Sequence, residues 1–274
     1  MLSPFQADEL IAQHLTCLPI ESLPIAQCAG AVLRENIYAE RDQPPFDRVT
    51  MDGIALDSRA GVRRLRIQAM QAAGDPPLTL CGRDHCIEVM TGTALPVGCD
   101  TVVPVERIAV SDGEAELAGD LVVEPGQNIH RRASDTRQGN LLLAAGTRLG
   151  PPEIAIAAGA GMARIRVSSQ PMLAVISTGN ELVEPGEPIL PHQIRRSNAY
   201  AIAAALRLHG FQRVADDHIG DDAAELRRRL KFHLETHDVL VLSGGVSMGK
   251  LDLVPQALEE LGVRCVFHKV AQRP

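Results

Sequence analysis

The amino-acid sequence predicts a multidomain protein of the α/β plus β class, in which a parallel, three-layer α/β domain accompanies an inserted small β-domain. Two continuous apolar runs, Met172–Ser177 and Asp238–Ser243, have the length of a strand and end in glycine-containing loops, which is typical of buried parallel strands. Between residues 47 and 143, short β-prone runs instead alternate with Gly, Pro and Asp turns. The 274 residues are enough for more than one hydrophobic core.

The chain is accordingly divided into four segments. We expect residues 1–46 to form the helical and linker part of an elongated domain, and residues 47–143 to form the small β-domain. Residues 144–170 are the helical return segment of the elongated domain, and residues 171–274 are the α/β domain.

The first half should contain few helices. Apolar spacing predicts helices over residues 5–17 and Ile25–Leu33, and a Pro-Pro start predicts another over residues 150–163. The β-domain runs have alternating polar residues, which favours half-exposed antiparallel strands. These runs are Leu65–Ala69, Ile87–Met90, Thr101–Val105 and Leu121–Val123.

The second half alternates strands and helices, which predicts right-handed crossovers and a parallel sheet covered on both faces. The expected helices are Asn198–His209, Asp222–Thr236 and Pro255–Leu261, and two further strands are expected near Arg213–His218 and Val263–Lys269. Ligands of such sheets bind at the carboxyl ends of the strands.

Composition excludes several classes of function. The formal charge is −7 and no Lys/Arg cluster is interleaved with aromatic residues, so nucleic-acid binding is not expected. No apolar run approaches the roughly 20 residues of a membrane span, and no secretory leader is visible, so a cytoplasmic protein is expected. Cys81 and Cys86 flank His85 in CGRDHC, which fits either a metal cluster or small hydrophobic residues in a β-domain.

The loops that follow the two apolar strands predict a phosphate site. The first reads Ser177-Thr178-Gly179-Asn180-Glu181-Leu182, and the second reads Ser243-Gly244-Gly245-Val246-Ser247-Met248-Gly249. Glycines allow backbone N–H groups to approach a phosphate, and four hydroxyl groups add donors. The hydroxyls are those of Ser177, Thr178, Ser243 and Ser247.

Three carboxylates are expected at the same edge, namely Glu181, Asp221 and Asp252. Their mutual repulsion beside a phosphate favours binding of a hard cation such as Mg²⁺. Asp221 or Asp222 has a second interpretation, as the cap of the following helix. Lys269 and Arg273 fit either cations that face the phosphate or solvated surface charges.

Six segments in order along the chain make it similar to the molybdopterin molybdotransferase family, the MoeA-type enzymes and the related gephyrin E domain. Without this resemblance, Asp52-Gly53 and Thr91-Gly92 read only as a turn and a strand end. The six segments are PPFDRVTMDGIAL (Pro44–Leu56), MTGTALPVGCDTVV (Met90–Val103), GQNIHRRASD (Gly126–Asp135), STGNEL (Ser177–Leu182), SGGVSMGKLD (Ser243–Asp252) and FHKVAQRP (Phe267–Pro274).

The resemblance implies a transferase of molybdenum cofactor biosynthesis, which inserts molybdate into adenylylated molybdopterin and releases AMP with the help of Mg²⁺. It also implies a homodimer whose site combines the α/β domain of one subunit with the β-domain of the other. Contact with the molybdopterin adenylyltransferase and with molybdoenzyme maturation proteins follows from the same likeness. By motif position, Asp52, Thr91 and Asp135 become functional residues beside Glu181, Asp221 and Asp252.

Departures from the family pattern raise alternatives. Asn180 stands where many members have Asp, His130 stands in a run that is commonly arginine, and Arg273 replaces a frequent lysine. Family members continue past Pro274, so the α/β domain is expected to be incomplete, with an exposed sheet edge and poor solubility.

The shortened chain leaves open a non-catalytic molybdopterin-binding protein and a gephyrin-like scaffold. A nucleotide hydrolase related to the competence-damage proteins does not explain the MDG and TGTALP segments.

Overall fold

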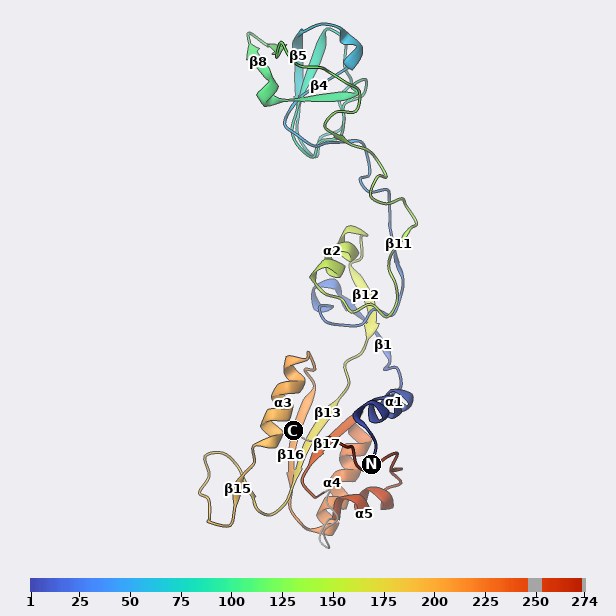
Figure 1. The fold of residues 1–274 in the computed structure, drawn as a ribbon, viewed down its shortest axis with the longest axis vertical. Coiled ribbons are helices and arrows are strands. Elements are labelled where there is room, and N and C mark those ends of the chain that lie inside the picture. Colours follow the sequence, from blue (N-terminus) through green and yellow to red (C-terminus); the bar gives the residue numbers. More distant parts are fainter. Residues whose placement is uncertain (246–252, 273–274) are drawn as a thin grey trace. The chain divides into compact units, whose positions relative to one another are not determined.

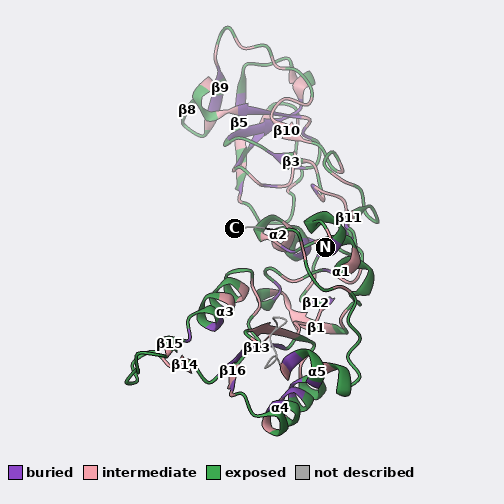
Figure 2. Ribbon diagram, turned by 60° about the horizontal axis from the view of Figure 1, so that its bottom comes forward, coloured by how far each residue is buried: buried purple, intermediate pink, exposed green. Residues whose placement is uncertain are grey.

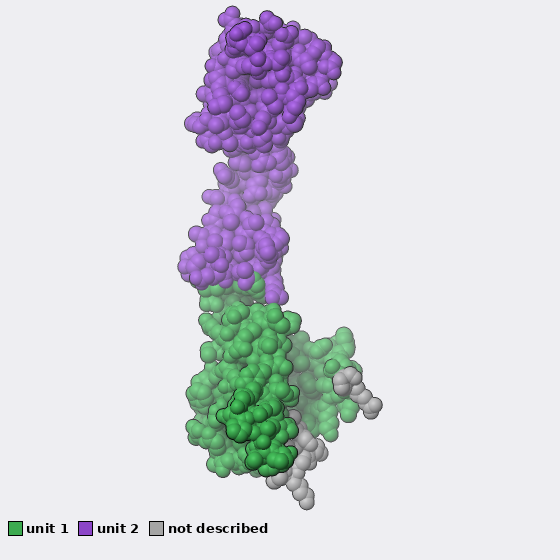
Figure 3. All heavy atoms as spheres, turned by 90° about the vertical axis from the view of Figure 1, so that its left-hand side faces the viewer, with its two compact units in different colours: residues 1–23, 30–34, 166–274 green, residues 24–29, 35–165 purple. Residues whose placement is uncertain are grey.

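The computed structural model describes residues 1–245 and 253–272, which separate into two compact units (Figure 1). Unit 1 consists of residues 1–23, 30–34 and 166–274, and unit 2 consists of residues 24–29 and 35–165 (Figure 3). Each unit has its own hydrophobic core.

Unit 2 is built around a curled six-stranded sheet with the strand order β7-β4-β6-β5-β9-β8. The neighbours pair antiparallel except β5 and β6, which run parallel. The parallel pair corrects the expectation of a purely antiparallel domain. The strands are β4 (Gly53–Leu56), β5 (Arg64–Gln71), β6 (His85–Val89), β7 (Thr101–Pro104), β8 (Ile108–Ser111) and β9 (Glu114–Leu117).

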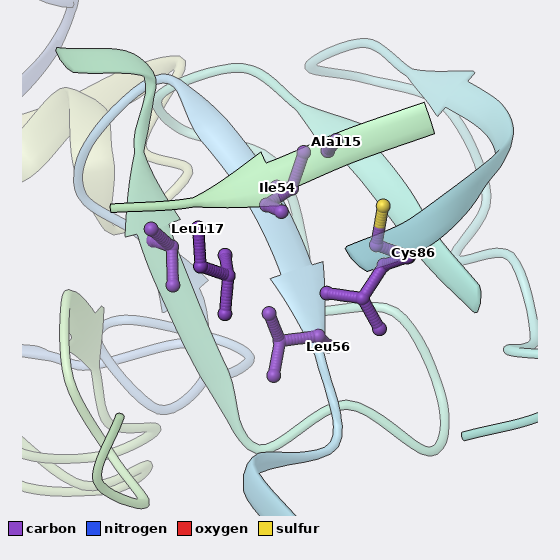
Figure 4. Packing of buried hydrophobic residues seen from close by; sticks show 7 residues of the cluster. Ile54, Leu56, Cys86, Ala115 and Leu117 are labelled. Atoms are coloured by element: carbon purple, nitrogen blue, oxygen red, sulfur yellow. The ribbon is translucent and has the colours of Figure 1, made fainter. Parts of the chain in front are cut away.

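The central strand β4 of the unit 2 sheet is buried on both faces. Ile54 and Leu56 of β4 belong to one aliphatic cluster, in which Cys86 and Leu117 also lie (Figure 4). Ala55, the residue between them, belongs to a second cluster on the other face. The expectation of half-exposed strands is confirmed for β5, in which exposed and buried residues alternate, but it is wrong for β7, in which Thr101, Val102 and Val103 are buried.

Short pairs and one helix complete unit 2. β2 (Ile37–Tyr38) pairs with β11 (Leu141–Leu143), and β3 (Arg48–Val49) pairs with β10 (Ile129–His130). The helix α2 (Pro151–Gly159) begins at the predicted proline pair. Three short 3₁₀ helices are η1 (Ile25–Gln27), η2 (Ser58–Ala60) and η3 (Val105–Arg107).

Two sequence predictions for the first half are wrong. Ile25–Leu33 is helical only in η1, because Gly30 has a φ of +81° and Leu33 forms an antiparallel bridge with Val167. Leu121–Val123 is not a strand, although Leu121 and Val123 still pack against the core. Their apolar side chains pack a loop against the core cluster of the sheet.

Unit 1 contains a parallel sheet whose described strands have the order β16-β13-β17. β13 (Leu173–Thr178), β16 (Val214–Ile219) and β17 (Val239–Ser243) confirm three of the predicted strands. Residues 263–269 contain no strand, and beyond them Val270 forms only an isolated bridge with Leu2. The prediction of a strand at Val263–Lys269 is therefore wrong.

Helices cover both faces of this sheet, which gives three layers (Figure 1). Alternate residues of β13 separate the faces, since Val175 packs against α3 (Asn198–Leu208), whereas Ala174 and Ile176 pack against α4 and α5. α4 (Ala223–Thr236) and α5 (Leu253–Glu260) bury the side that lies on the sheet (Figure 2).

Other short elements complete the described chain. The helix α1 (Pro4–His14) starts with a capping box between Ser3 and Gln6 and ends three residues before its predicted end. β1 (Ile20–Pro24) pairs with β12 (Arg164–Ser168), and β14 (Leu182–Val183) pairs with β15 (Ile194–Arg195). No helix among the described residues is both long and apolar enough to cross a membrane.

Asp57 gives unit 2 a testable dependence on acid. Its buried carboxylate accepts hydrogen bonds from Arg59 Nε at 2.7 Å and Arg83 Nε at 3.2 Å. The side-chain hydrogen bond from Arg59 is the largest cause that lowers the pKa of Asp57 from 3.8 to about 2. Because the pKa is lower in the folded state, this stabilisation is present above pH 4 and is lost as the pH falls toward 2.

We expect Asp57→Asn to cost about 1–3 kcal/mol of unfolding free energy at pH 7, because it weakens charge-assisted hydrogen bonds at a buried group. Between pH 4 and pH 2, the melting temperature of the variant should fall less steeply than that of the wild type. Circular dichroism melts across this range test the difference. Asp120→Asn, an exposed carboxylate paired with Arg107, is the control. Parallel pH profiles for wild type and Asp57→Asn would contradict the assignment.

Candidate active site at the carboxyl edge of the parallel sheet

A pocket of about 200 Å³ lies at the carboxyl ends of the three parallel strands in unit 1. Its polar lining comes from the last residue of β13 and from the loops that follow β13, β16 and β17. Its apolar lining comes from α4 and the start of α5. The lining residues are Thr178, Gly179, Glu181, Gly220, Asp221, Leu226, Gly245, Leu253 and Val254. Five of them are predicted site residues, namely Thr178, Gly179, Glu181, Asp221 and Gly245.

Glycines allow the loop after β17 to lie directly on the end of β13. A Cβ atom at Gly244 would be 2.5 Å from the Thr178 carbonyl oxygen, and one at Gly245 would be 2.7 Å from Thr178 Oγ1. Both glycines have left-handed φ values, +95° and +61°. The Thr178 hydroxyl is buried and has no hydrogen-bond partner among the described residues. A buried hydroxyl in a pocket wall is an available donor for a ligand oxygen.

Two of the three predicted carboxylates reach this pocket. The Glu181 side chain occupies the space that a side chain at Gly179 would need, since a Cβ there would be 2.2 Å from Glu181 Oε2. Asp221 Oδ2 accepts the Asn180 backbone N–H at 3.0 Å. Asp252, the third carboxylate, lies outside the described residues.

The capping interpretation holds for Asp222 and not for its neighbour. Asp222 is the N-cap of α4, and its carboxylate accepts the Glu225 backbone N–H at 2.7 Å. Among the described residues, Asp221 makes no capping contact; its carboxylate accepts the Asn180 backbone N–H, and the residue lines the pocket. Asp222 therefore caps the helix, whereas Asp221 belongs to the pocket.

The two predicted serines at the strand ends lie on the opposite side of the sheet. Because side chains alternate along a strand, Ser177 points toward the α3 side, where its Oγ accepts a hydrogen bond from Arg196 Nε at 3.2 Å. Ser243 Oγ likewise accepts from Asn198 Nδ2 at 3.1 Å. Neither serine lines the pocket. Ser247 lies outside the described residues.

Sequence reasoning missed Arg196, a guanidinium that is only 4% exposed. It forms ion pairs with Glu184 and Asp216 and donates to the Asp217 carbonyl oxygen at 2.9 Å. These contacts join β13, β16 and the segment after β14. The available signal was Asp216-Asp217 within a strand, because two carboxylates that follow each other in a sheet favour a nearby cation on each face.

In unit 2, the predicted residues Asp52 and Thr91 lie together. Asp52 Oδ1 accepts the Thr91 backbone N–H at 2.6 Å and the Thr91 hydroxyl at 2.7 Å. The backbone hydrogen bond from Thr91 is the main cause that lowers the pKa of Asp52. Asp52 also borders a mostly apolar pocket of about 220 Å³ between β4, β6 and β8.

Asp135 takes part in a different network of unit 2. Its Oδ1 lies 2.9 Å from His130 Nε2, and the other ring nitrogen of His130 lies 3.0 Å from an Arg48 guanidinium nitrogen. Arg131 and Arg132 are paired with Asp47 and Asp42. The positive charges of this segment are thus largely balanced by neighbouring carboxylates.

Neither of the two cations predicted near the end of the chain, Lys269 and Arg273, is among the described residues that line the pocket. The Lys269 carbonyl oxygen accepts the Leu2 backbone N–H at 3.0 Å, and Lys269 does not line the pocket. Arg273 lies outside the described residues. In CGRDHC, burial raises the pKa of the Cys86 thiol to about 12, and Cys86 packs as a small hydrophobic residue. The described residues contain no group of three or more His, Cys, Asp or Glu side chains that could hold a metal ion.

The fold and the pocket define a class of protein: a parallel α/β ligand-binding domain with a glycine-lined, acidic pocket, combined with a separate curled β-sheet domain. Residues 2–161 match the family described as the MoeA N-terminal region (domain I and II), and residues 174–274 match a probable molybdopterin binding domain. The chain therefore belongs to the MoeA family.

Curated relatives and solved structures agree with this placement. The molybdopterin molybdenumtransferase of Synechocystis is 38% identical over all of this chain and 71% of its own length. Molybdopterin molybdenumtransferase 2 of Mycobacterium tuberculosis is 33% identical over all of this chain and 70% of its own length. The crystal structure of a molybdopterin biosynthesis MoeA protein from Pyrococcus horikoshii has a TM-score of 0.78 at 31% identity, covering 99% of this chain and 69% of that one.

Proposed function

We propose that this protein is a molybdopterin molybdenumtransferase of molybdenum cofactor biosynthesis, which inserts molybdate into adenylylated molybdopterin and releases AMP. The observation that carries the proposal is the pocket in which Thr178, the glycine loops, Glu181 and Asp221 meet. It lies in the part of the chain that matches a molybdopterin binding domain. The functional residues of unit 2, Asp52, Thr91 and Asp135, belong to the same proposal.

The pocket has the parts needed to hold a phosphate group. Gly245 brings backbone close to the ligand position without a side chain, and backbone N–H groups in such loops bind phosphate oxygens. The Thr178 hydroxyl supplies a further donor. Leu226, Leu253 and Val254 exclude water from one wall, which strengthens these polar contacts.

The donor atoms also fit Mg²⁺, since carboxylate oxygens are the ligands that this hard cation prefers. Glu181 and Asp221 would hold the ion, together with Asp252 as a proposed third ligand. When bound, Mg²⁺ supplies positive charge opposite the phosphoanhydride oxygens. We propose that the carboxylates also orient water at the reacting phosphate.

Replacing Glu181 by Gln is expected to lower molybdate-dependent AMP release at least about 100-fold, because it removes a charge that acts in the transition state. AMP formation from adenylylated molybdopterin, measured with and without molybdate, tests this. Glu187→Gln, an exposed carboxylate outside the pocket, is the matched control.

Normal AMP release by the Glu181→Gln protein would contradict the assignment of Glu181. If the wild type bound adenylylated molybdopterin but released no AMP, the alternative of a non-catalytic binding protein would replace the proposed activity.

A homodimer is part of the same proposal, as is the assignment of residues 171–274 as the ligand-binding domain and residues 47–143 as the small β-domain. Sedimentation velocity of the purified chain tests the oligomeric state. A dimer supports the proposal, and a monomer at micromolar concentration contradicts it.

A further inference from the structure

The loops after β13 and β16 are joined by hydrogen bonds beside the pocket. Asn180 donates its backbone N–H to Asp221 Oδ2 at 3.0 Å, and Asn180 Oδ1 accepts the Asp221 backbone N–H at 3.1 Å. Two residues 41 positions apart in sequence thus exchange two hydrogen bonds. The pair fixes both the backbone and the carboxylate of Asp221.

Other contacts also join these two loops, but they do not involve Asp221. Gly179 donates its N–H to the Ile219 carbonyl oxygen at 3.1 Å, and His218 Nε2 lies 2.9 Å from the Gly179 carbonyl oxygen. One contact joins two backbones and the other joins the His218 side chain to a backbone, and neither involves a carboxylate. Gly220 makes room for the amide, because a Cβ there would be only 2.6 Å from Asn180 Oδ1. Asn180 therefore holds Asp221 at two points, since its backbone N–H binds the carboxylate and its side-chain oxygen binds the Asp221 backbone N–H.

The chemistry of the amide also matters. Asn180 satisfies the Asp221 backbone N–H with a neutral oxygen, so it adds no charge to a pocket that already contains Glu181 and Asp221. An aspartate at this position would accept the same hydrogen bond and add a negative charge. The residue at position 180 can therefore change the cation affinity of the pocket without changing its hydrogen bonds.

We propose that Asn180 is a positioning residue, which orients the Asp221 carboxylate toward the pocket and moderates the affinity of the pocket for a divalent cation. The inference rests on the proposed function, in which Glu181 and Asp221 hold Mg²⁺. It assigns Asn180 no contact with the reacting atoms. Its effect passes through Asp221.

Three variants separate hydrogen bonding from charge. Asn180→Ala removes the bond from the Asp221 backbone N–H, and Asn180→Asp keeps an acceptor but adds a charge. Gly220→Ala changes neither Asn180 nor Asp221, but its added Cβ would push the Asn180 amide away from the Asp221 backbone N–H. The matched control is Gly119→Ala, because Gly119, like Gly220, does not have a left-handed φ, and no atom lies within 4 Å of its added Cβ.

The probe is Mg²⁺ alone, titrated calorimetrically into the ligand-free protein. We expect about tenfold weaker Mg²⁺ binding for Asn180→Ala and weaker binding for Gly220→Ala, because both changes free the Asp221 backbone and so loosen the residue that carries a metal ligand. Asn180→Asp should bind Mg²⁺ about tenfold more tightly than the wild type. Melting temperatures should stay within about 3 °C, because the pair is exposed at the surface.

The readout does not depend on turnover. If the wild type released no AMP but the variants changed Mg²⁺ affinity in the stated directions, the proposed activity would fail and the inference about Asn180 would stand. Equal Mg²⁺ affinity in wild type and Asn180→Ala, or no Mg²⁺ binding by either protein, would overturn it. So would weaker binding by Asn180→Asp than by Asn180→Ala.

Discussion

Replacing Arg196 by Met is expected to lower the free energy of unfolding by about 1.5–3 kcal/mol, because a buried guanidinium loses charge-assisted hydrogen bonds to partly exposed carboxylates. The guanidinium is 4% exposed and has carboxylate partners on two elements, Glu184 and Asp216. Methionine fills part of the volume but leaves Asp216 and the Asp217 carbonyl oxygen without their donor. The carboxyl edge of β16 should loosen first.

Urea unfolding followed by circular dichroism measures this effect. Arg195→Met is the matched control, because Arg195 is exposed and its guanidinium donates to the Glu184 carbonyl oxygen at 2.7 Å. It should cost less than about 1 kcal/mol. Equal destabilisation by the two variants would show that Arg196 does not act as a buried anchor.

Replacing Gly53 by Ala should destabilise unit 2 by about 3 kcal/mol or more, at the upper end of the cost of overpacking. A Cβ at this position would be 1.9 Å from the Val103 carbonyl oxygen and 2.9 Å from Pro104 Cα. Both atoms belong to β7, which pairs with β4, so no side-chain movement relieves the clash. The strands themselves must separate.

The change also moves Asp52, which precedes Gly53 and is bound to Thr91. Gly61→Ala provides the control: Gly61 also has a positive φ (+68°) and lies in unit 2, but no atom is within 4 Å of its added Cβ. Thermal unfolding by calorimetry compares the two. If Gly53→Ala melted at the same temperature as Gly61→Ala, the result would contradict the inference that β4 and β7 are too close for a side chain at position 53.

The sequence was most informative where structure depends on local pattern. The apolar runs of β13 and β17, and the glycines that follow them, sufficed to predict two parallel strands and a pocket at their ends. The helices α3 and α4 follow their predicted ranges within one residue, and Asp222 caps α4. These features depend on periodicity and capping, which involve residues a few positions apart.

The predictions that failed depend on partners far away in the sequence. Ile25–Leu33 has helical spacing, but Leu33 pairs with Val167, and tertiary contacts outweigh propensity. Arg196 becomes a buried anchor only because Asp216, twenty residues later, faces it. The residues next to Arg196 in the sequence do not distinguish it from a solvated arginine, and the available signal was the distant Asp216-Asp217 pair.

Strand alternation could have refined the predicted site. Thr178 and Ser177 are adjacent, so they must face opposite sides of the sheet, and only Thr178 reaches the pocket. The same rule places Ser243 beside Asn198 on the α3 side. The prediction that all of these hydroxyls bind one ligand therefore included side chains that face the other side of the sheet.

The central claim is that the glycine-lined pocket of unit 1 holds the phosphate-bearing ligand. Its most direct test is equilibrium binding of adenylylated molybdopterin, in the presence of Mg²⁺, to the wild type and to Gly245→Ala and Gly186→Ala, with melting temperatures measured alongside. A Cβ at Gly245 would press on Thr178 Oγ1, whereas one at Gly186 meets nothing within 4 Å. We predict at least tenfold weaker binding for Gly245→Ala and unchanged binding for Gly186→Ala; equal affinity of all three proteins would contradict the claim.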